Sequence, residues 1–288
     1  MTSTRDWSVR DLWAIVALLI ASFVAFLPAW RELVTEILRR EDNGYILIVP
    51  FVAAYLAWIR RSRFRYIRRR PSLSGVSLIA AAAGLAWFGA ETDTRIATHL
   101  AAILGFVACF VVLAGFAVLR QMSPVFLALL FLIPIPGEIR RAIAGPLQQL
   151  AVIVTHDVLS LVGIPSEREG IRILIDQKEI LVGEACDGMR MVFALALTFF
   201  AFVFSIPLRS QARVILLLAS PFVALLCNMV RLVVTGFAYA FSTTQFAEEL
   251  HDVAGWLMLP LAIMLLQGIV RFMRWLDLPV YTWRFLQA

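Results

Sequence analysis

Residues 212–240, ARVILLLASPFVALLCNMVRLVVTGFAYA, form the apolar run that decides the fold class of this chain. About 20 apolar residues cross the hydrocarbon core of a bilayer, so this run is longer than one membrane span requires. Deep in the run stand Asn228 and, three residues later, Arg231. The stretch therefore predicts a long transmembrane helix with polar side chains in its C-terminal half.

The rest of the chain has the same character, since 61% of its 288 residues are hydrophobic and the mean hydropathy is +0.85. Soluble globular domains carry only about 45–50% apolar residues. The pattern predicts an all-α polytopic membrane protein, a single integral membrane domain over residues 1–288 with no large water-soluble part. Eight spans are expected, at 12–29, 44–59, 75–90, 96–119, 123–136, 188–206, 212–240 and 253–273.

The orientation follows from the segment RRSRFRYIRRR, 60–70, which places seven arginines between the second and third predicted spans. Positively charged loops stay in the cytoplasm, so both termini are expected inside and the segment 137–187 outside. A nucleic-acid-binding patch is the alternative interpretation of these arginines. A short loop between two spans has little room for that role, so we expect the lipid bilayer and no nucleic acid as a partner.

The outer segment 137–187 is the only sizeable piece between spans. Its first part, 139–164, has apolar residues at roughly helical spacing and predicts a helix lying in the membrane interface. The next part, GIRILIDQKEILVG (170–183), alternates around a polar turn and predicts a short β-hairpin. The hairpin would deliver the chain to Glu184 and to the sixth span.

The stretch GEACDGMRMVF, 183–193, places Cys186, Asp187 and Arg190 where the sixth span begins. The odd number of cysteines in the chain, three, rules out a fully paired disulfide framework. A helix N-terminus and a nearby arginine both favour the thiolate form of Cys186. Ionisable residues within membrane spans are functional candidates, although Arg190 and Arg231 have the alternative of extending to the lipid headgroups.

His251 begins the eighth predicted span at the same outer level as Cys186 and Arg231. A cysteine nucleophile, a histidine base and an arginine that stabilises an oxyanion would form a covalent acyl-transfer site. The triplet His-Asp-Val occurs at both 156–158 and 251–253, and spacing prefers His251 to His156 or His99 only slightly. A capping or surface role for His251 is the alternative. No metal-ligand spacing is present, so we expect no metal and no cofactor.

Three motifs in this order resemble the exosortase/archaeosortase family. The family signature E-A-C-S-G-L/M-R corresponds to residues 184–190, and its N-x-x-R corresponds to residues 228–231. A downstream histidine followed by an apolar span matches His251. The resemblance extends over 131–150 and 161–190, and NGYILIVPFVAAYLAWIRRSR (43–63) is similar to an early family segment but lacks its Ser-His pair.

The resemblance implies a membrane cysteine transpeptidase, analogous to sortases by convergence, in a bacterial or archaeal cytoplasmic membrane. Its partners would be membrane-anchored proteins whose C-terminal tail carries a short motif such as Pro-Glu-Pro, a hydrophobic helix and a basic cluster. Cys186 would be the nucleophile, Arg231 would stabilise the oxyanion or thiolate, and His251 would serve as general acid and base. The acceptor that receives the cleaved protein is not specified by the sequence.

Asp187 departs from the family pattern, which has serine beside the nucleophile. A carboxylate there opposes formation of the thiolate, or it pairs with Arg190 or orients His251 instead. Two other classes of function stay open at this point: a non-enzymatic component of a polysaccharide export or assembly system, and a transporter with Arg190 and Arg231 as an anion site. No inverted repeat supports the transporter.

Overall fold

The computed structural model describes residues 9–39, 41–66, 72–175, 178–181 and 188–281. These residues are almost all helical, which confirms the predicted all-α class with one small sheet. The chain divides into two compact units, Met1–Ile135 and Pro136–Ala288. A single integral membrane domain over residues 1–288 stays a prediction.

The first unit is built around a central helix, α5 (Arg95–Ala114), whose side chains are the most completely buried of the unit. Its other α-helices are α1 (Val9–Ala25), α2 (Leu27–Arg39), α3 (Val49–Ile59), α4 (Leu73–Glu91) and α6 (Ala117–Leu129). Short 3₁₀ helices occur at Glu41–Ile48, Arg61–Tyr66 and Leu130–Leu132. α1, α2, α4 and α6 all pack on α5, which explains its burial.

Glycines set the close approach of α4 to α5. A Cβ atom added at Gly75 would lie 2.5 Å from the backbone of Val112, and one at Gly89 would lie 2.8 Å from the side chain of Thr98. Apolar helices in a bilayer gain stability from close van der Waals packing, which small residues at the contact permit. The two glycines hold the α4–α5 pair together near both of its ends.

α1 and α2 form a bent pair with an angle of 69° between them. The ring of Phe26, at the bend, lies over Gly105 of α5, where an added Cβ would be 2.5 Å from the ring. Beyond the bend, α2 carries Glu32 and Glu36. Arg95 of α5 lies 3.1 Å from a carboxylate oxygen of Glu32 and 3.6 Å from one of Glu36. These contacts join α2 to the start of α5.

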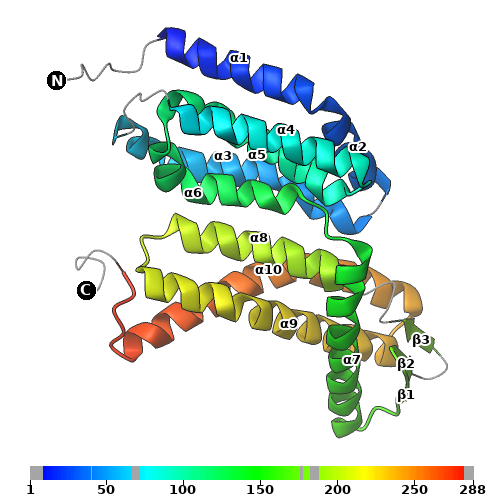
Figure 1. Ribbon diagram of the computed structural model, residues 1–288. Coiled ribbons are helices and arrows are strands. Elements are labelled where there is room, and N and C mark those ends of the chain that lie inside the picture. Colours follow the sequence, from blue (N-terminus) through cyan, green and yellow to red (C-terminus); the bar gives the residue numbers. More distant parts are fainter. Residues whose placement is uncertain (1–8, 40, 67–71, 176–177, 182–187, 282–288) are drawn as a thin grey trace. The chain divides into compact units, whose positions relative to one another are not determined.

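The described part of the second unit contains four helices and a small sheet (Figure 1). The helices are α7 (Gly137–Leu161), α8 (Gly188–Ser205), α9 (Ser210–Phe241) and α10 (Thr244–Trp275). The sheet contains β1 (Glu167–Glu169), β2 (Arg172–Ile175) and β3 (Lys178–Leu181), which are antiparallel in the order β1-β2-β3. α9 has the most extensive contacts, because α7, α8 and α10 all pack against it.

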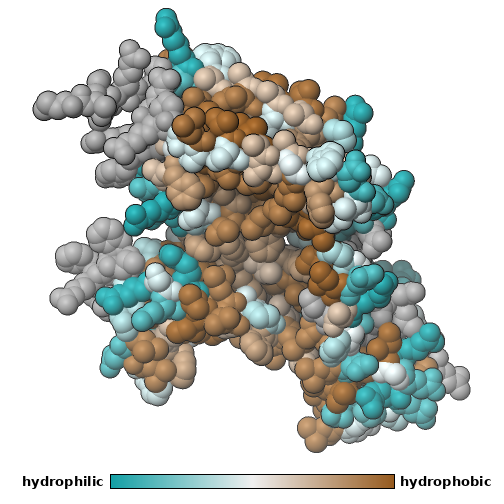
Figure 2. All heavy atoms as spheres, in the orientation of Figure 1, coloured by the Kyte–Doolittle hydropathy of each residue, from teal (hydrophilic) through white to brown (hydrophobic). Residues whose placement is uncertain are grey.

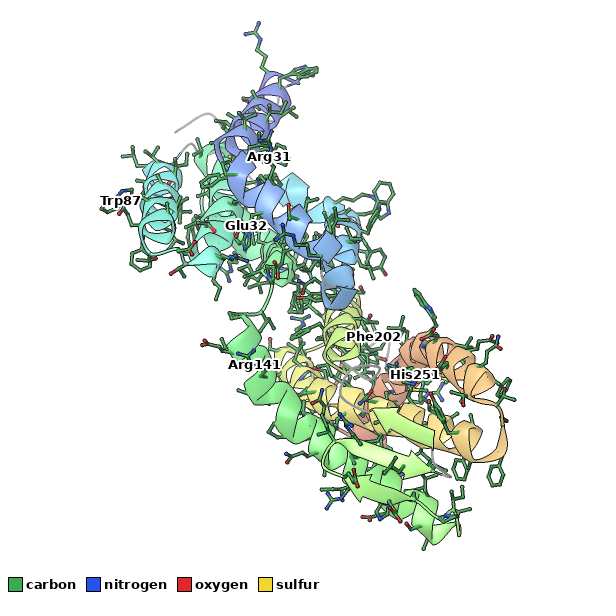
Figure 3. All side chains as sticks on the ribbon, turned by 90° about the vertical axis from the view of Figure 1, so that its right-hand side faces the viewer. Arg31, Glu32, Trp87, Arg141, Phe202 and His251 are labelled. Carbon is green, nitrogen blue, oxygen red and sulfur yellow. The ribbon has the colours of Figure 1, made fainter. Side chains whose placement is uncertain are left out.

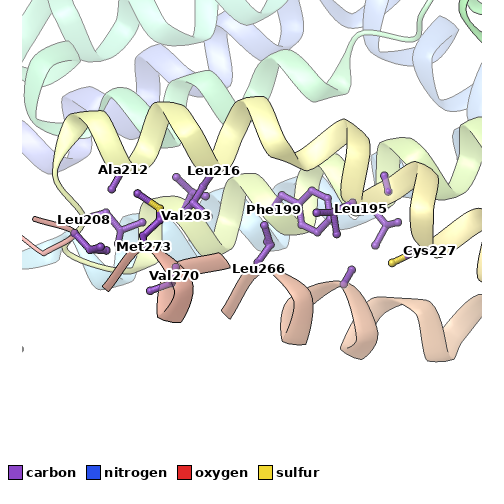
Figure 4. Close-up of a cluster of buried hydrophobic side chains, with 14 of the residues drawn as sticks. Leu195, Phe199, Val203, Leu208, Ala212, Leu216, Cys227, Leu266, Val270 and Met273 are labelled. Atoms are coloured by element: carbon purple, nitrogen blue, oxygen red, sulfur yellow. The ribbon is translucent and has the colours of Figure 1, made fainter. Parts of the chain in front are cut away.

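Apolar side chains from α8, α9 and α10 pack together in the main core of this unit (Figure 4). Phe199, Leu216 and Leu266 contribute one fully buried side chain from each of the three helices. The chain after α10 returns to the turn between α8 and α9, where the amide of Arg209 donates to the carbonyl of Val280 at 2.8 Å. This return fixes the ends of the three helices against one another.

α9 keeps its hydrogen bonding complete at an internal proline. Pro221 has no amide hydrogen, so the carbonyl of Leu217 loses its usual helical donor. The hydroxyl of Ser220 donates to this carbonyl at 2.7 Å. An unsatisfied carbonyl in an apolar environment is costly, so Ser220 stabilises α9 at the proline.

The predicted hairpin over 170–183 is confirmed as the pair β2–β3, in which Arg172 is opposite Leu181 and Ile175 is opposite Lys178. The sequence did not indicate β1 as a third strand. The predicted helix over 139–164 is confirmed as α7, and its place in the membrane interface stays a prediction. Ile173 and Ile175 of β2 are buried among side chains of α7 and α9.

Four helices of the described chain, α4, α5, α9 and α10, are long and apolar enough to cross a membrane, and the bent pair α1–α2 makes up to five. Three further apolar helices overlap predicted spans but are shorter than the 18 residues taken as the minimum for a span: Asn43–Ile59, Ala117–Leu132 and Val192–Ser205. The structure thus supports a multi-pass membrane protein and does not confirm a count of eight. Apolar side chains cover much of the helical surface, as a lipid environment requires (Figure 2).

Candidate functional site

The turn between α9 and α10 reverses the chain and places Arg231 of α9 beside His251 of α10. α9 ends at Phe241 and α10 begins at Thr244, whose N-cap Thr243 accepts a hydrogen bond from the amide of Phe246 at 3.4 Å. Arg231 lies about three turns before this turn, and His251 lies about two turns after it. α9 and α10 pack against each other, so both side chains reach the contact surface between these two helices, which is called the seam below.

Arg231 and His251 meet in that seam, where Nη2 of the guanidinium is hydrogen-bonded to Nε2 of the imidazole. His251 is 9% exposed, and Figure 3 shows it on α10. A guanidinium only donates hydrogen bonds, so Nε2 must act as the acceptor and carry no proton in this contact. The contact therefore holds His251 in its neutral form.

Thr235 completes the arrangement from the turn of α9 that follows Arg231. Its hydroxyl donates to the carbonyl of Arg231 at 2.9 Å and lies 3.1 Å from Nδ1 of His251. The single hydroxyl proton is used on the carbonyl, so the hydroxyl oxygen accepts from Nδ1–H. The hydrogen-bond network thus assigns the proton of His251 to Nδ1 and the lone pair, which accepts from Arg231, to Nε2.

Two neighbours shape the space around the guanidinium. Gly255 lies one turn beyond His251, and a Cβ built there would be 3.8 Å from Cζ of Arg231. Asn228 lies on the same face of α9 as Arg231 and is 7% exposed. Its Oδ1 is buried without a hydrogen-bond partner among the residues that the structure describes.

The structure brings together two of the three residues expected to react, Arg231 and His251, and buries Asn228 one turn before Arg231 on α9. Cys186, Asp187 and Glu184 lie outside the described residues. The expected meeting of Cys186 with the other two residues accordingly stays a prediction. Arg190 falls in the first turn of α8, and its side chain is also outside the described part.

The position of His251 along its helix differs from the expectation. The span was expected to begin at residue 253, but α10 begins at Thr244, so His251 lies inside the helix rather than at its start. The first turns of α10 contain Glu248 and Glu249, which lowered the hydropathy of this part and hid the true helix start.

The other histidines have different partners. Nδ1 of His156, on α7, lies 2.9 Å from Oγ of Ser166. His99, on α5 of the first unit, is buried with Nε2 3.8 Å from a carboxylate oxygen of Glu32. Among the described residues, His251 is thus the histidine in contact with Arg231, a distinction that the repeated His-Asp-Val triplet could not make.

Thr235 was missed in the sequence, although a signal was present. Asn228, Arg231 and Thr235 are spaced by three and then four residues, which places all three on one face of a helix. A polar row of this kind within an apolar run indicates a shared polar environment. The described residues contain no group of three His, Cys, Asp or Glu side chains that could hold a metal ion.

Comparison with known families identifies the family of the chain. A family model described as "Transmembrane exosortase" matches residues 30–268, which include α9, the turn and His251. The chain therefore belongs to the transmembrane exosortase family. Neither curated proteins nor solved structures gave a significant match. Membership suggests a membrane transpeptidase of sorting signals.

Proposed function

We propose that this protein is a membrane cysteine transpeptidase that cleaves a C-terminal sorting signal through a thioester at Cys186 and transfers the cleaved protein to an acceptor. The observation that carries the proposal is the contact between Arg231 and His251 in a chain of the exosortase family. A guanidinium and a neutral imidazole in one buried seam supply an oxyanion donor and a proton acceptor.

The geometry suggests how the two side chains would work in sequence. His251 takes the thiol proton of Cys186 at Nε2 once the guanidinium has moved away from the single lone pair of that nitrogen. Protonated Nε2 is a donor and no longer accepts from Arg231, so the two groups stay apart. The guanidinium then turns to the negative charge that has formed on the thiolate and, later, on the carbonyl oxygen.

The covalent steps follow from these roles. The thiolate forms a bond to the scissile carbonyl carbon, and Arg231 stabilises the resulting oxyanion. As the carbon–nitrogen bond breaks, His251 returns its proton from Nε2 to the leaving amine. An acceptor amine then attacks the thioester carbon and gives a proton to His251, and the carbon–sulfur bond breaks to release the product from Cys186. Water in place of the amine would give hydrolysis.

The substrate would be a membrane-anchored protein whose tail carries a short motif, a hydrophobic helix and a basic cluster. The arginine-rich segment 60–70 sets the orientation of the enzyme with both termini in the cytoplasm. A tail with its own basic cluster would adopt the same orientation, since the same rule acts on it. Its motif would then lie beside Cys186 at the outer face of the cytoplasmic membrane.

The family match does not favour the other two classes, a component of polysaccharide export or assembly and a transporter. The polar groups of the seam also argue against a freely accessible anion site. Nη2 of Arg231 is engaged by His251, and a transported anion would have to displace it.

The test is co-expression of the full-length protein with a membrane protein that ends in such a tail. The variants are Cys186→Ala, Arg231→Ala and His251→Ala. Matched controls are Cys227→Ala, which removes a buried core thiol, and His156→Ala, which removes the histidine bonded to Ser166. We expect processing to stop in the first three variants and to continue in both controls.

Two further measurements define the reaction. An acyl-enzyme in wild type should be released by hydroxylamine, which cleaves thioesters. A product heavier than the cleaved chain indicates transfer to an acceptor. Continued processing by the Cys186→Ala variant would rule out the covalent mechanism.

A further inference from the structure

Thr235 has a position that an ordinary helical threonine does not have. Its side chain is 2% exposed in the seam between α9 and α10. The hydroxyl oxygen lies 2.9 Å from the carbonyl oxygen of Arg231 and 3.1 Å from Nδ1 of His251. The same hydroxyl therefore bridges the backbone of one proposed reacting residue and the ring of the other.

These contacts form a closed chain that begins and ends at Arg231. The guanidinium donates to Nε2 of His251, Nδ1–H donates to Thr235, and the threonine hydroxyl donates to the Arg231 carbonyl. Each proton points the same way around the loop, and hydrogen bonds that run in one direction strengthen one another. Reversing any one bond would leave two donors or two acceptors facing each other.

We infer that Thr235 is a positioning residue, which holds His251 with its proton on Nδ1 and its lone pair on Nε2, the nitrogen that is to accept the thiol proton. The inference rests on the acyl-transfer function proposed above. A histidine with the opposite tautomer would present an N–H to the thiol and would be unable to accept its proton. Without the hydroxyl, the contact with Arg231 alone favours this tautomer, and the ring loses the hydrogen bond that fixes its orientation at Nδ1.

A neutral hydroxyl suits this seam better than a carboxylate would. In Ser-His-Asp triads a buried aspartate performs the orienting role. Here a carboxylate beside Nδ1 would add a negative charge to the seam and would attract the positively charged guanidinium of Arg231. A hydroxyl fixes the ring without attracting Arg231 away from the reacting groups.

The matched control is Thr198 of α8, whose hydroxyl donates to the carbonyl of Ala194 at 2.8 Å. This is the same helical bond, from a hydroxyl to the carbonyl four residues earlier. Thr198→Val thus removes an equivalent intrahelical bond away from the seam. Valine has nearly the shape of threonine, so neither substitution leaves a cavity.

The experiment measures kcat and KM of full-length wild type, Thr235→Val, Thr235→Ser and Thr198→Val in proteoliposomes, with a tail-bearing membrane protein as substrate. We expect Thr235→Val to lower kcat by up to about 100-fold at unchanged KM, the loss typical of a misplaced reacting group. Serine should restore most of kcat, and Thr198→Val should resemble wild type. An unchanged kcat in Thr235→Val, or a serine variant as slow as the valine variant, overturns the inference.

A second measurement does not depend on turnover. The ¹⁵N chemical shifts of the His251 ring in detergent-solubilised protein report which nitrogen carries the proton. We expect Nδ1 to be protonated in wild type and in Thr235→Ser, and the preference to be weaker in Thr235→Val, where only the contact with Arg231 favours it. A wild-type ring protonated at Nε2 overturns the role of Thr235 even if the enzyme is active. Processing by Cys186→Ala alongside the expected shifts identifies a failure of the proposed function instead.

Discussion

The guanidinium of Arg231 packs over Gly255, one turn beyond His251 on α10. A Cβ at residue 255 would lie 3.8 Å from Cζ of Arg231, an ordinary van der Waals distance. The seam therefore has room for one methyl group at this position and for little more. Gly255 limits where the guanidinium can go when it separates from the imidazole.

Gly255→Ala should retain activity, whereas Gly255→Leu should lose it. The leucine side chain would displace the guanidinium from His251, and a displacement of about 1 Å is enough for a loss near 100-fold. The measurement is kcat/KM for processing of a tail-bearing substrate. Gly268→Leu is the control on the same helix, because nothing lies within 4 Å of a Cβ added there. Equal effects of the two leucines would contradict this prediction.

Asn228→Leu should make the protein more stable and less active. The buried Oδ1 without a described partner destabilises the fold, and removing it should raise the unfolding free energy by about 1–3 kcal/mol. Thr155→Val on α7 is the matched control, since its buried hydroxyl also has no hydrogen-bond partner among the described residues. Both variants should unfold at higher temperature in detergent, and only Asn228→Leu should slow processing. An active Asn228→Leu enzyme would show that the amide has no part in the reaction.

Ser220→Ala should destabilise the second unit only while Pro221 is present. The alanine variant leaves the Leu217 carbonyl without a donor, at a cost of about 1–3 kcal/mol. In the background Pro221→Ala, the new amide of residue 221 supplies the missing helical bond. A double-mutant cycle by thermal unfolding measures this coupling. The same cost in both backgrounds would show that the Ser220 hydroxyl does not serve the proline.

Gly75→Ala should separate α4 from α5. The added Cβ would lie 2.5 Å from backbone atoms of Val112, which cannot move aside as a side chain does. We expect a loss of about 1–3 kcal/mol of stability, as for overpacking of a core. Gly84→Ala on the same helix meets nothing within 4 Å and should instead gain about 0.5–1 kcal/mol from its better helix propensity. Thermal unfolding of the two variants in detergent should shift in opposite directions.

The sequence predicted most of the helical elements because each apolar run is long and is bounded by charges or turns. It also predicted the hairpin over 170–183, since alternation around a polar turn is a local signal. The number of spans could not be settled in this way. The run near residues 12–29 is divided by the bend at Phe26, and the helix Ala117–Leu132 falls short of a full span. Helix bending and length depend on packing that composition does not encode.

The site was predicted in part. Arg231 stood out because ionisable groups in apolar runs are costly. Spacing preferred His251 only slightly to the other histidines, and the structure places it in contact with Arg231. Thr235 did not stand out, since threonine carries no charge and commonly bonds to its own helix. Its role depends on which ring nitrogen of His251 faces α9, and that is a property of the two-helix seam rather than of either sequence segment.

The short turn between α9 and α10 has a consequence for the biogenesis of the protein. Arg231 and His251 are separated by only 20 residues, so their contact closes a small loop and requires no distant part of the chain. Contacts between such close neighbours form quickly, and this hairpin emerges from the ribosome as one piece. We therefore expect the contact between Arg231 and His251 to form in the newly made chain as soon as α10 has entered the bilayer.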